Sequence, residues 1–182
     1  MKFTGIGLEG AHLIEPEPIS DNRGWFARVF CRNEFKEIGF QKEIVQMNHT
    51  YTKMASAIRG LHYQIPPSSE MKLVRCIRGA VYDVIVDLRA GSDTFLHFAG
   101  VELSAENRLM LIVPEYFAHG FQTLTDDCEM LYCHTGFYSR EHERGLRFDD
   151  PILGIRWPLE ISEISERDRN FELLKPDYRG IK

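Results

Sequence analysis

The stretch KLVRCIRGAVYDVIVDLR, Lys72 to Arg89, decides the fold class of this chain. It contains two runs rich in β-branched, aromatic and leucine residues, and the Arg-Gly pair between them is a turn signal. Similar short runs lie at residues 57–65, 98–104, 108–114, 120–125 and 129–138. Because turn signals separate them at close spacing, the sequence predicts an all-β sandwich or barrel rather than alternating strands and helices. Short helices are predicted only at 33–40 and at 165–174, where Ser165 is a candidate N-cap.

Length and composition exclude several classes of protein. The 182 residues fit one domain, 1–182, with a sizeable core, and the 43% hydrophobic content is typical of a globular chain. The net charge of −5 and the lack of a basic stripe argue against a nucleic-acid partner. No apolar run approaches the roughly 18 residues of a membrane span, and the N-terminus lacks the apolar core of a signal peptide. The four cysteines have no CxxC spacing, so the sequence predicts a cytoplasmic protein with reduced thiols.

Strand alternation places polar side chains on otherwise apolar faces. Strict alternation puts Ile58, Gly60, His62 and Gln64 on one face, and puts Arg59 on the other unless Gly60 permits a bulge. Three further faces carry the same mixture: Lys72, Val74, Cys76 and Arg78; Phe117, His119 and Phe121; Met130, Tyr132, His134, Gly136 and Tyr138. A barrel lined in this way would hold a small polar ligand in an apolar cup.

Several motifs, in the same order along the chain, resemble those of the dTDP-4-dehydrorhamnose 3,5-epimerase family. The chain has DNRGWF at 21–26, QMNHTYTKMASAIRGLHYQ at 46–64 and FAHGF at 117–121, with further matches at 72–95, 131–132, 148–158 and 165–168. The resemblance implies a double-stranded β-helix, the cupin jelly roll, that forms a homodimer through an N-terminal arm of about residues 1–50. It also implies that no cofactor or metal is bound. The implied substrate is a nucleotide-diphospho-4-keto-6-deoxyhexose. The implied reaction converts dTDP-4-dehydro-6-deoxy-D-glucose to dTDP-4-dehydro-L-rhamnose, a step of polysaccharide biosynthesis.

The resemblance also implies roles for individual residues. His62 matches the family's base and Asp168 the carboxylate that orients it, which suits an imidazole whose ordinary pKa of about 6.5 lies near working pH. Lys72 matches the cation beside the developing enolate, and Tyr132 matches the acid on the far face of the sugar. The positions implied to contact substrate are Arg23, Phe26, Gln46, Asn48, Arg59, His119 and Tyr138.

Some residues depart from the family pattern. Arg28 stands where Glu is common, Ser56 and Tyr116 stand where Gly is common, and Cys133, His134 and Phe137 also differ. These departures leave open a mono-epimerase, a CDP- or GDP-sugar epimerase, or a sugar-nucleotide-binding protein without activity.

Each assignment also has a purely structural alternative. Lys72 could be a solvated charge at a strand edge, and Asp168 could be the capping-box partner of Ser165. A metal-dependent cupin is disfavoured because Gln64 stands where the second histidine of His-x-His is expected and Lys72 would repel a cation.

Overall fold

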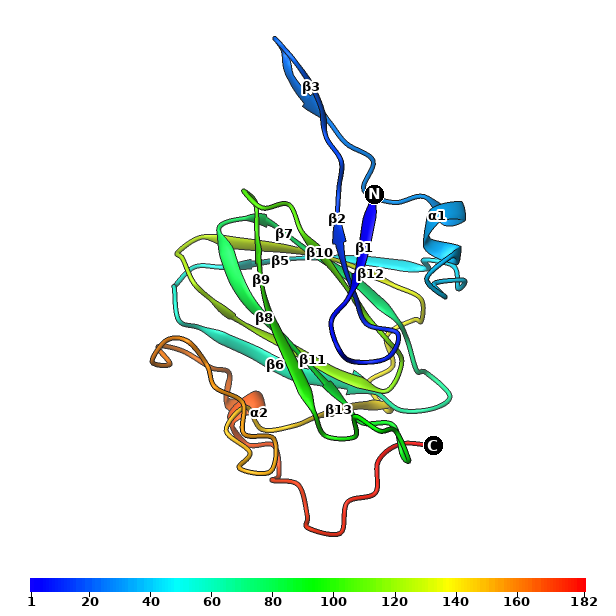
Figure 1. Cartoon of the computed structure of the whole chain (residues 1–182). Coiled ribbons are helices and arrows are strands. Elements are labelled where there is room, and N and C mark those ends of the chain that lie inside the picture. The colour runs from blue at the N-terminus through cyan, green and yellow to red at the C-terminus, as the bar shows by residue number, and fades with distance from the viewer.

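Two antiparallel β-sheets packed face to face make up the body of the chain in the computed structural model, which describes residues 1–182 (Figure 1). The first sheet has six strands, in the order β1 (Lys2–Gly5), β2 (His12–Glu15), β10 (Met110–Val113), β7 (Lys72–Arg78), β12 (Cys128–His134) and β5 (Gln46–Thr52). The second has five, in the order β13 (Glu143–Gly145), β6 (Ile58–Gln64), β11 (Phe117–Thr123), β8 (Ala80–Asp87) and β9 (Phe98–Ser104). The chain crosses repeatedly between the sheets, so this is a jelly roll and the predicted fold class is confirmed.

The predicted elements are present with shifted ends. Strand β11 begins at Phe117 rather than at Gly120, and β12 ends at His134 rather than at Tyr138. The predicted helices are single turns, α1 (Arg32–Lys36) and α2 (Glu166–Arg169), and neither has the length or apolar character of a membrane-spanning helix. The short N-terminal strands, β5 and β13 had no counterpart among the predicted runs, because they are brief or largely polar.

Strand β8 is covered on both faces, which explains its apolar sequence. Val81 and Ile85 point into the core between the two sheets, whereas Val84 and Val86 pack under the C-terminal segment. The outer face of the five-stranded sheet is therefore a second core rather than a solvated surface. The outer face of the six-stranded sheet is covered in the same way by Phe35 of α1 and its neighbours.

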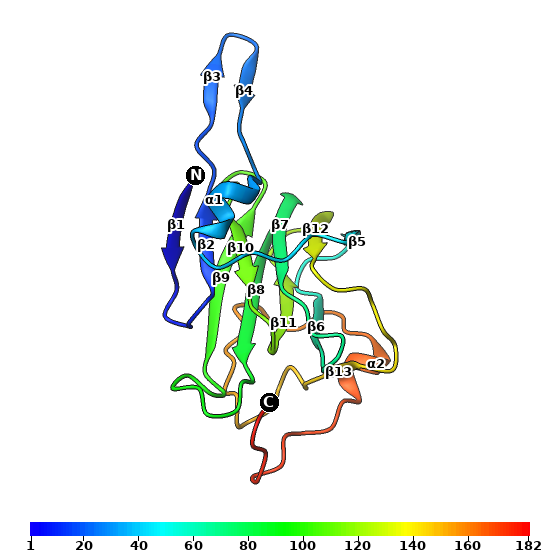
Figure 2. The same cartoon turned by 90° about the vertical axis from the view of Figure 1, so that its right-hand side faces the viewer.

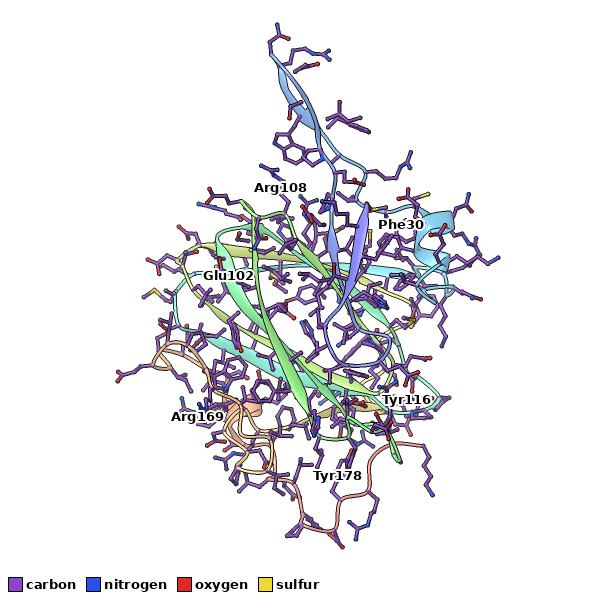
Figure 3. The ribbon with its side chains drawn as sticks, in the orientation of Figure 1. Phe30, Glu102, Arg108, Tyr116, Arg169 and Tyr178 are labelled. Carbon is purple, nitrogen blue, oxygen red and sulfur yellow. The ribbon has the colours of Figure 1, made fainter.

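A β-hairpin projects from the body near the N-terminus. Its strands are β3 (Ile19–Asp21) and β4 (Gly24–Phe26), and Figure 2 shows it standing clear of both sheets. Its apolar side chains are exposed, with Phe26 at 73% and Trp25 at 50%. Near its base the guanidinium of Arg108, labelled in Figure 3, lies 4.8 Å from the ring centroid of Trp25. Monomeric proteins rarely expose such an arm without a partner.

A β-bulge interrupts β6. Arg59 lies opposite Phe121 and His62 lies opposite His119, so two residues of β6 face the single residue between these partners on β11. One of the two is Gly60, whose φ of 111° is disfavoured for any side-chain-bearing residue. A Cβ at Gly60 would lie 2.6 Å from a backbone Cα of β11. Glycine is therefore required at this position.

The bulge corrects the strict alternation expected along β6. Because two residues occupy one step, Arg59 and His62 point to the same face. Both side chains can therefore reach the same cavity. Ile58 pairs with Gln122 and takes the opposite face, so the prediction that it shares a face with His62 is wrong.

Candidate active site

A cavity of about 780 Å³ lies between the two sheets. Its walls come from β6 and β11 on one side, from β5, β7 and β12 on the other, and from the segment around α2. This volume is in the range of small-molecule sites. The structure brings most of the predicted site residues together here: Asn48, Arg59, His62, Lys72, His119, Tyr132, Tyr138 and Asp168.

His62 and Asp168 form a hydrogen-bonded pair in the cavity. The distance from His62 Nε2 to Asp168 Oδ1 is 2.7 Å, and the second carboxylate oxygen accepts the N–H of Gly60 at 3.1 Å. The bulge in β6 therefore supplies an anchor for Asp168. Ser165 caps α2 as predicted, accepting the backbone N–H of Asp168 at 3.1 Å. The cap uses only the backbone of Asp168 and leaves its carboxylate for His62.

The surroundings of Asp168 favour its charged form. Burial alone would raise the pKa of this carboxyl, but hydrogen bonds from His62 and Gly60 and the nearby Arg167 hold the pKa below its usual value. A carboxylate at this distance accepts a hydrogen bond from the Nε2–H group and so keeps the proton on that nitrogen. Nδ1 of His62 makes no hydrogen bond within the chain. Such an arrangement presents an unprotonated imidazole nitrogen to a ligand.

Arg167 and Glu143 extend this pair, and neither was among the predicted site residues. Arg167 Nη1 donates to Glu143 Oε2 at 3.0 Å, Nη2 lies 2.9 Å from His62 Nε2, and Nε lies 3.4 Å from Asp168. Since a guanidinium only donates, Arg167 favours an unprotonated Nε2, the opposite of what Asp168 favours. The shorter, charge-assisted bond to Asp168 at 2.7 Å favours the tautomer with the proton on Nε2. Arg167 stands inside the SERD motif and could have been inferred from it, whereas Glu143 had no sequence signal.

Lys72 is buried at the start of the central strand β7, which contradicts the alternative of a solvated edge charge. Its Nζ donates to the His62 carbonyl at 3.4 Å and lies 3.7 Å from Glu70 Oε1. Burial lowers the pKa of Lys72, and the negative charge of Glu70 opposes that shift. The cation is thus held in a low-dielectric site beside the base.

Tyr132 faces the cavity from the same six-stranded sheet as Lys72, opposite His62. The centroids of the Tyr132 and His119 rings are 6.0 Å apart, and the Tyr132 hydroxyl is 3.4 Å from Thr50 Oγ1. Burial raises the pKa of Tyr132 well above its ordinary value. The phenol therefore remains protonated and able to donate.

His119 is held by a buried carboxylate. Its Nε2 lies 2.9 and 3.0 Å from the two oxygens of Asp83, and both side chains are almost fully buried. Asp83 was not predicted, although a charged residue between Val81 and Ile85 on an inward face signals a buried partner.

Arg59 contributes a positive charge with no acidic partner. Its guanidinium donates to Thr52 Oγ1 at 2.8 Å and to the Tyr51 carbonyl at 3.2 Å. These two neutral acceptors orient the side chain and leave its charge uncompensated. An anionic ligand group is the natural complement of such a site.

Three predicted residues lie outside the cavity walls. Gln46 sits at the edge, where it donates to Asn48 at 3.3 Å and accepts the Tyr138 N–H at 3.1 Å. Arg23 and Phe26 are on the projecting hairpin, away from the cavity of their own chain (Figure 2). Their predicted contact with substrate would need a second subunit.

The chain has no cluster of three or more His, Cys, Asp or Glu side chains arranged to hold a metal ion. Metal independence itself stays a prediction, to be tested by chelation.

Comparison with known proteins identifies close relatives over nearly the whole chain. The family model described as dTDP-4-dehydrorhamnose 3,5-epimerase matches residues 6–176. The dTDP-4-dehydrorhamnose 3,5-epimerase of Methanothermobacter thermautotrophicus is 44% identical over 177 residues, which cover 96% of this chain and 95% of that protein.

Two solved structures share the fold. The dTDP-4-dehydrorhamnose 3,5-epimerase of Bacillus anthracis, solved with TDP and pyrophosphate, superposes with a TM-score of 0.90 at 38% identity, covering 95% of this chain and 100% of that one. The Legionella pneumophila dTDP-6-deoxy-D-glucose-3,5-epimerase, in complex with dTDP-4-keto-L-rhamnose, gives 0.89 at 35% identity, covering 94% and 92%.

Proposed function

We propose a mechanism on the premise that this chain belongs to the dTDP-4-dehydrorhamnose 3,5-epimerase family. It is an isomerase that inverts C3 and C5 of dTDP-4-dehydro-6-deoxy-D-glucose, giving dTDP-4-dehydro-L-rhamnose. One observation carries the mechanism: an imidazole base and a phenol acid face one cavity from opposite sheets. Inversion needs this, because a proton must leave one face of the sugar and return to the other.

His62 removes the proton next to the C4 keto group. The C–H bond breaks, the proton moves to Nδ1, and the electron pair shifts onto the keto oxygen to form an enolate. Asp168, charged and hydrogen-bonded at 2.7 Å, stabilises the imidazolium that forms.

Lys72 stabilises the enolate oxygen. A fixed ammonium in a buried site acts strongly on charge that develops there, and Glu70 at 3.7 Å helps to keep it protonated. Tyr132 then gives its proton to the same carbon from the far side, which inverts the centre. Exchange with solvent restores the proton on Tyr132 and removes the one on His62. The same groups serve C3 and C5, because the keto group acidifies both neighbours. No cofactor takes part.

The diphosphate is bound by cations in the cavity, with Arg59 as the principal contact because no acidic group neutralises it. Asn48, Tyr138 and His119 contact the rest of the nucleotide sugar. Gln46 does so from the cavity edge.

The decisive experiment is turnover of dTDP-4-keto-6-deoxyglucose in heavy water. We expect two deuterium atoms in the product, one at C3 and one at C5, by mass spectrometry and NMR. A single deuterium confined to one carbon would make the chain a mono-epimerase and would direct attention to Arg28, His134 and Phe137. No exchange at all would leave a binding protein as the better description. The same assay with the CDP- and GDP-linked sugars tests the nucleotide.

We further propose that residues 1–182 act as one domain and pair as a homodimer, in which the hairpin of each subunit brings Arg23 and Phe26 to the partner's cavity. Two observations support this: Phe26 is exposed, and no residue of the hairpin lines the cavity of its own chain. Light scattering should give a dimer, and Phe26→Ser should raise KM, whereas Leu173→Ser, at another exposed apolar residue, should not. A monomer with full activity would refute the arrangement.

A further inference from the structure

We propose that His134, oriented by Glu70, is a positioning residue that fixes the Asn48 side-chain amide as a hydrogen-bond donor toward the nucleotide-sugar substrate. The inference deepens the proposed function and rests on it. His134 has no part in the reaction described above, and Glu70 acts there only on Lys72, yet both line the cavity.

Glu70 and His134 form a buried pair. His134 Nδ1 lies 2.8 Å from Glu70 Oε2, and their side chains are only 10% and 7% exposed. The other oxygen of Glu70 is the one near Lys72, at 3.7 Å. A carboxylate only accepts, so Nδ1 carries the proton and donates a hydrogen bond to Glu70. In the neutral imidazole, Nε2 is then left as an acceptor.

That acceptor determines the orientation of Asn48. His134 Nε2 lies 3.2 Å from Asn48 Nδ2, so one amide hydrogen of Asn48 is donated to the ring. The opposite orientation would place the amide oxygen against the lone pair of Nε2. Reversal therefore costs a hydrogen bond and adds a repulsion at a partly buried site.

The chain of hydrogen bonds continues from Asn48 along the rim of the cavity, and it also fixes the orientation of the next amide. Asn48 Oδ1 accepts from Gln46 Nε2 at 3.3 Å, and Gln46 Oε1 accepts the backbone N–H of Tyr138 at 3.1 Å. Each amide keeps one N–H that is not used in this chain of bonds. The wall therefore offers donors in fixed positions, which suit carbonyl, hydroxyl or phosphate oxygens of a nucleotide sugar.

His134 also packs beside the acid without bonding to it. The Tyr132 and His134 rings are stacked with centroids 6.2 Å apart. A loss of packing would therefore affect Tyr132 and turnover, whereas a loss of Asn48 orientation would affect binding. The two effects are separated by comparing KM with kcat.

The test is steady-state kinetics on dTDP-4-keto-6-deoxyglucose. His134→Leu removes both hydrogen bonds and should raise KM about tenfold, equivalent to about 1.4 kcal/mol, while kcat falls less than about threefold. His134→Gln keeps one donor and one acceptor and should restore KM to within about threefold of wild type. His134→Val is a second apolar variant should the leucine protein not fold. The control is His49→Leu, which removes a histidine paired with Glu129 at 2.8 Å outside the cavity and should leave KM unchanged.

A double-mutant cycle tests whether His134 acts through Asn48. In an Asn48→Ala background, His134→Leu should change KM by less than about twofold. The inference is overturned if the apolar variants keep the wild-type KM, if His134→Gln is as impaired as His134→Leu, or if the two substitutions act independently. A wild-type protein that does not turn over this sugar would overturn the proposed function, and this inference with it.

Discussion

Replacing Asp168 by asparagine should reduce activity while leaving the fold and substrate binding nearly intact. The carboxylate accepts three hydrogen bonds, from His62 Nε2 at 2.7 Å, from the Gly60 N–H at 3.1 Å and, more weakly, from Arg167 Nε at 3.4 Å. Asparagine has a single acceptor oxygen. If that oxygen keeps the Gly60 bond, the amide nitrogen faces His62, and two donors oppose each other.

His62 can resolve this conflict only by moving its proton to Nδ1, the nitrogen that must act as the base. Loss of a charge-assisted hydrogen bond is worth about 1.5–3 kcal/mol, or roughly 10- to 150-fold in rate. The wrong tautomer adds to this, and a comparable change in a Ser-His-Asp site lowers kcat about 10⁴-fold. We therefore expect kcat to fall about 10²- to 10⁴-fold, with KM within about threefold of wild type.

The assay is loss of the C3 and C5 proton signals of the substrate in heavy water, followed by NMR. Asp149→Asn is the matched control, because that carboxylate pairs with Arg147 away from the cavity. It should exchange protons at the wild-type rate. If Asp168→Asn retained about a third or more of the wild-type exchange rate, the assignment of Nδ1 as base would be refuted.

Four further predictions follow from the site. Tyr132→Phe should slow inversion more than proton exchange, because the base alone can return a proton with retention; equal slowing in heavy water would contradict this. Glu70→Gln removes the negative charge that raises the pKa of Lys72 against the effect of burial, so the pKa should fall further. The alkaline limb of the pH profile of kcat/KM should then move to lower pH, and an unchanged profile would argue against a protonated Lys72 in catalysis. Gly60→Ala should destabilise the fold by about 1–3 kcal/mol from backbone strain alone, measured by thermal unfolding, and a wild-type melting temperature would show that the bulge tolerates a side chain. Exhaustive chelation should leave turnover intact, and loss that one particular metal restores would disprove metal independence.

The central strands were predictable because their chemistry is regular. β-branched and aromatic runs between turn signals located β6 to β12, and alternation correctly grouped Lys72, Tyr132 and His119 on inward faces. The N-terminal hairpin was missed as a pair of strands because its residues Ile19 and Phe26 are exposed and few, so no apolar periodicity marks it.

The remaining parts of the site depend on contacts that no local pattern encodes. The bulge at Gly60 breaks the period of two, so strict alternation placed Arg59 and Ile58 on the wrong faces. Glu70 lies in a loop where a charge is ordinarily solvated, and only the fold brings it to His134. The capping-box spacing of Ser165 and Asp168 predicted the cap correctly but could not show that the carboxylate turns toward His62.

The pairing of His62 with Asp168 joins residues separated by most of the chain. Asp168 belongs to the C-terminal segment, which crosses the outer face of the five-stranded sheet and is joined to it by few backbone bonds, among them isolated bridges at Ile58–Ile164 and Arg89–Ile181. Segments held in this way open at lower free energy than the strands beneath them. The jelly roll can therefore be complete while the base still lacks its carboxylate. On warming, we expect the enzyme to lose activity before its core melts, because the segment that carries Asp168 opens first.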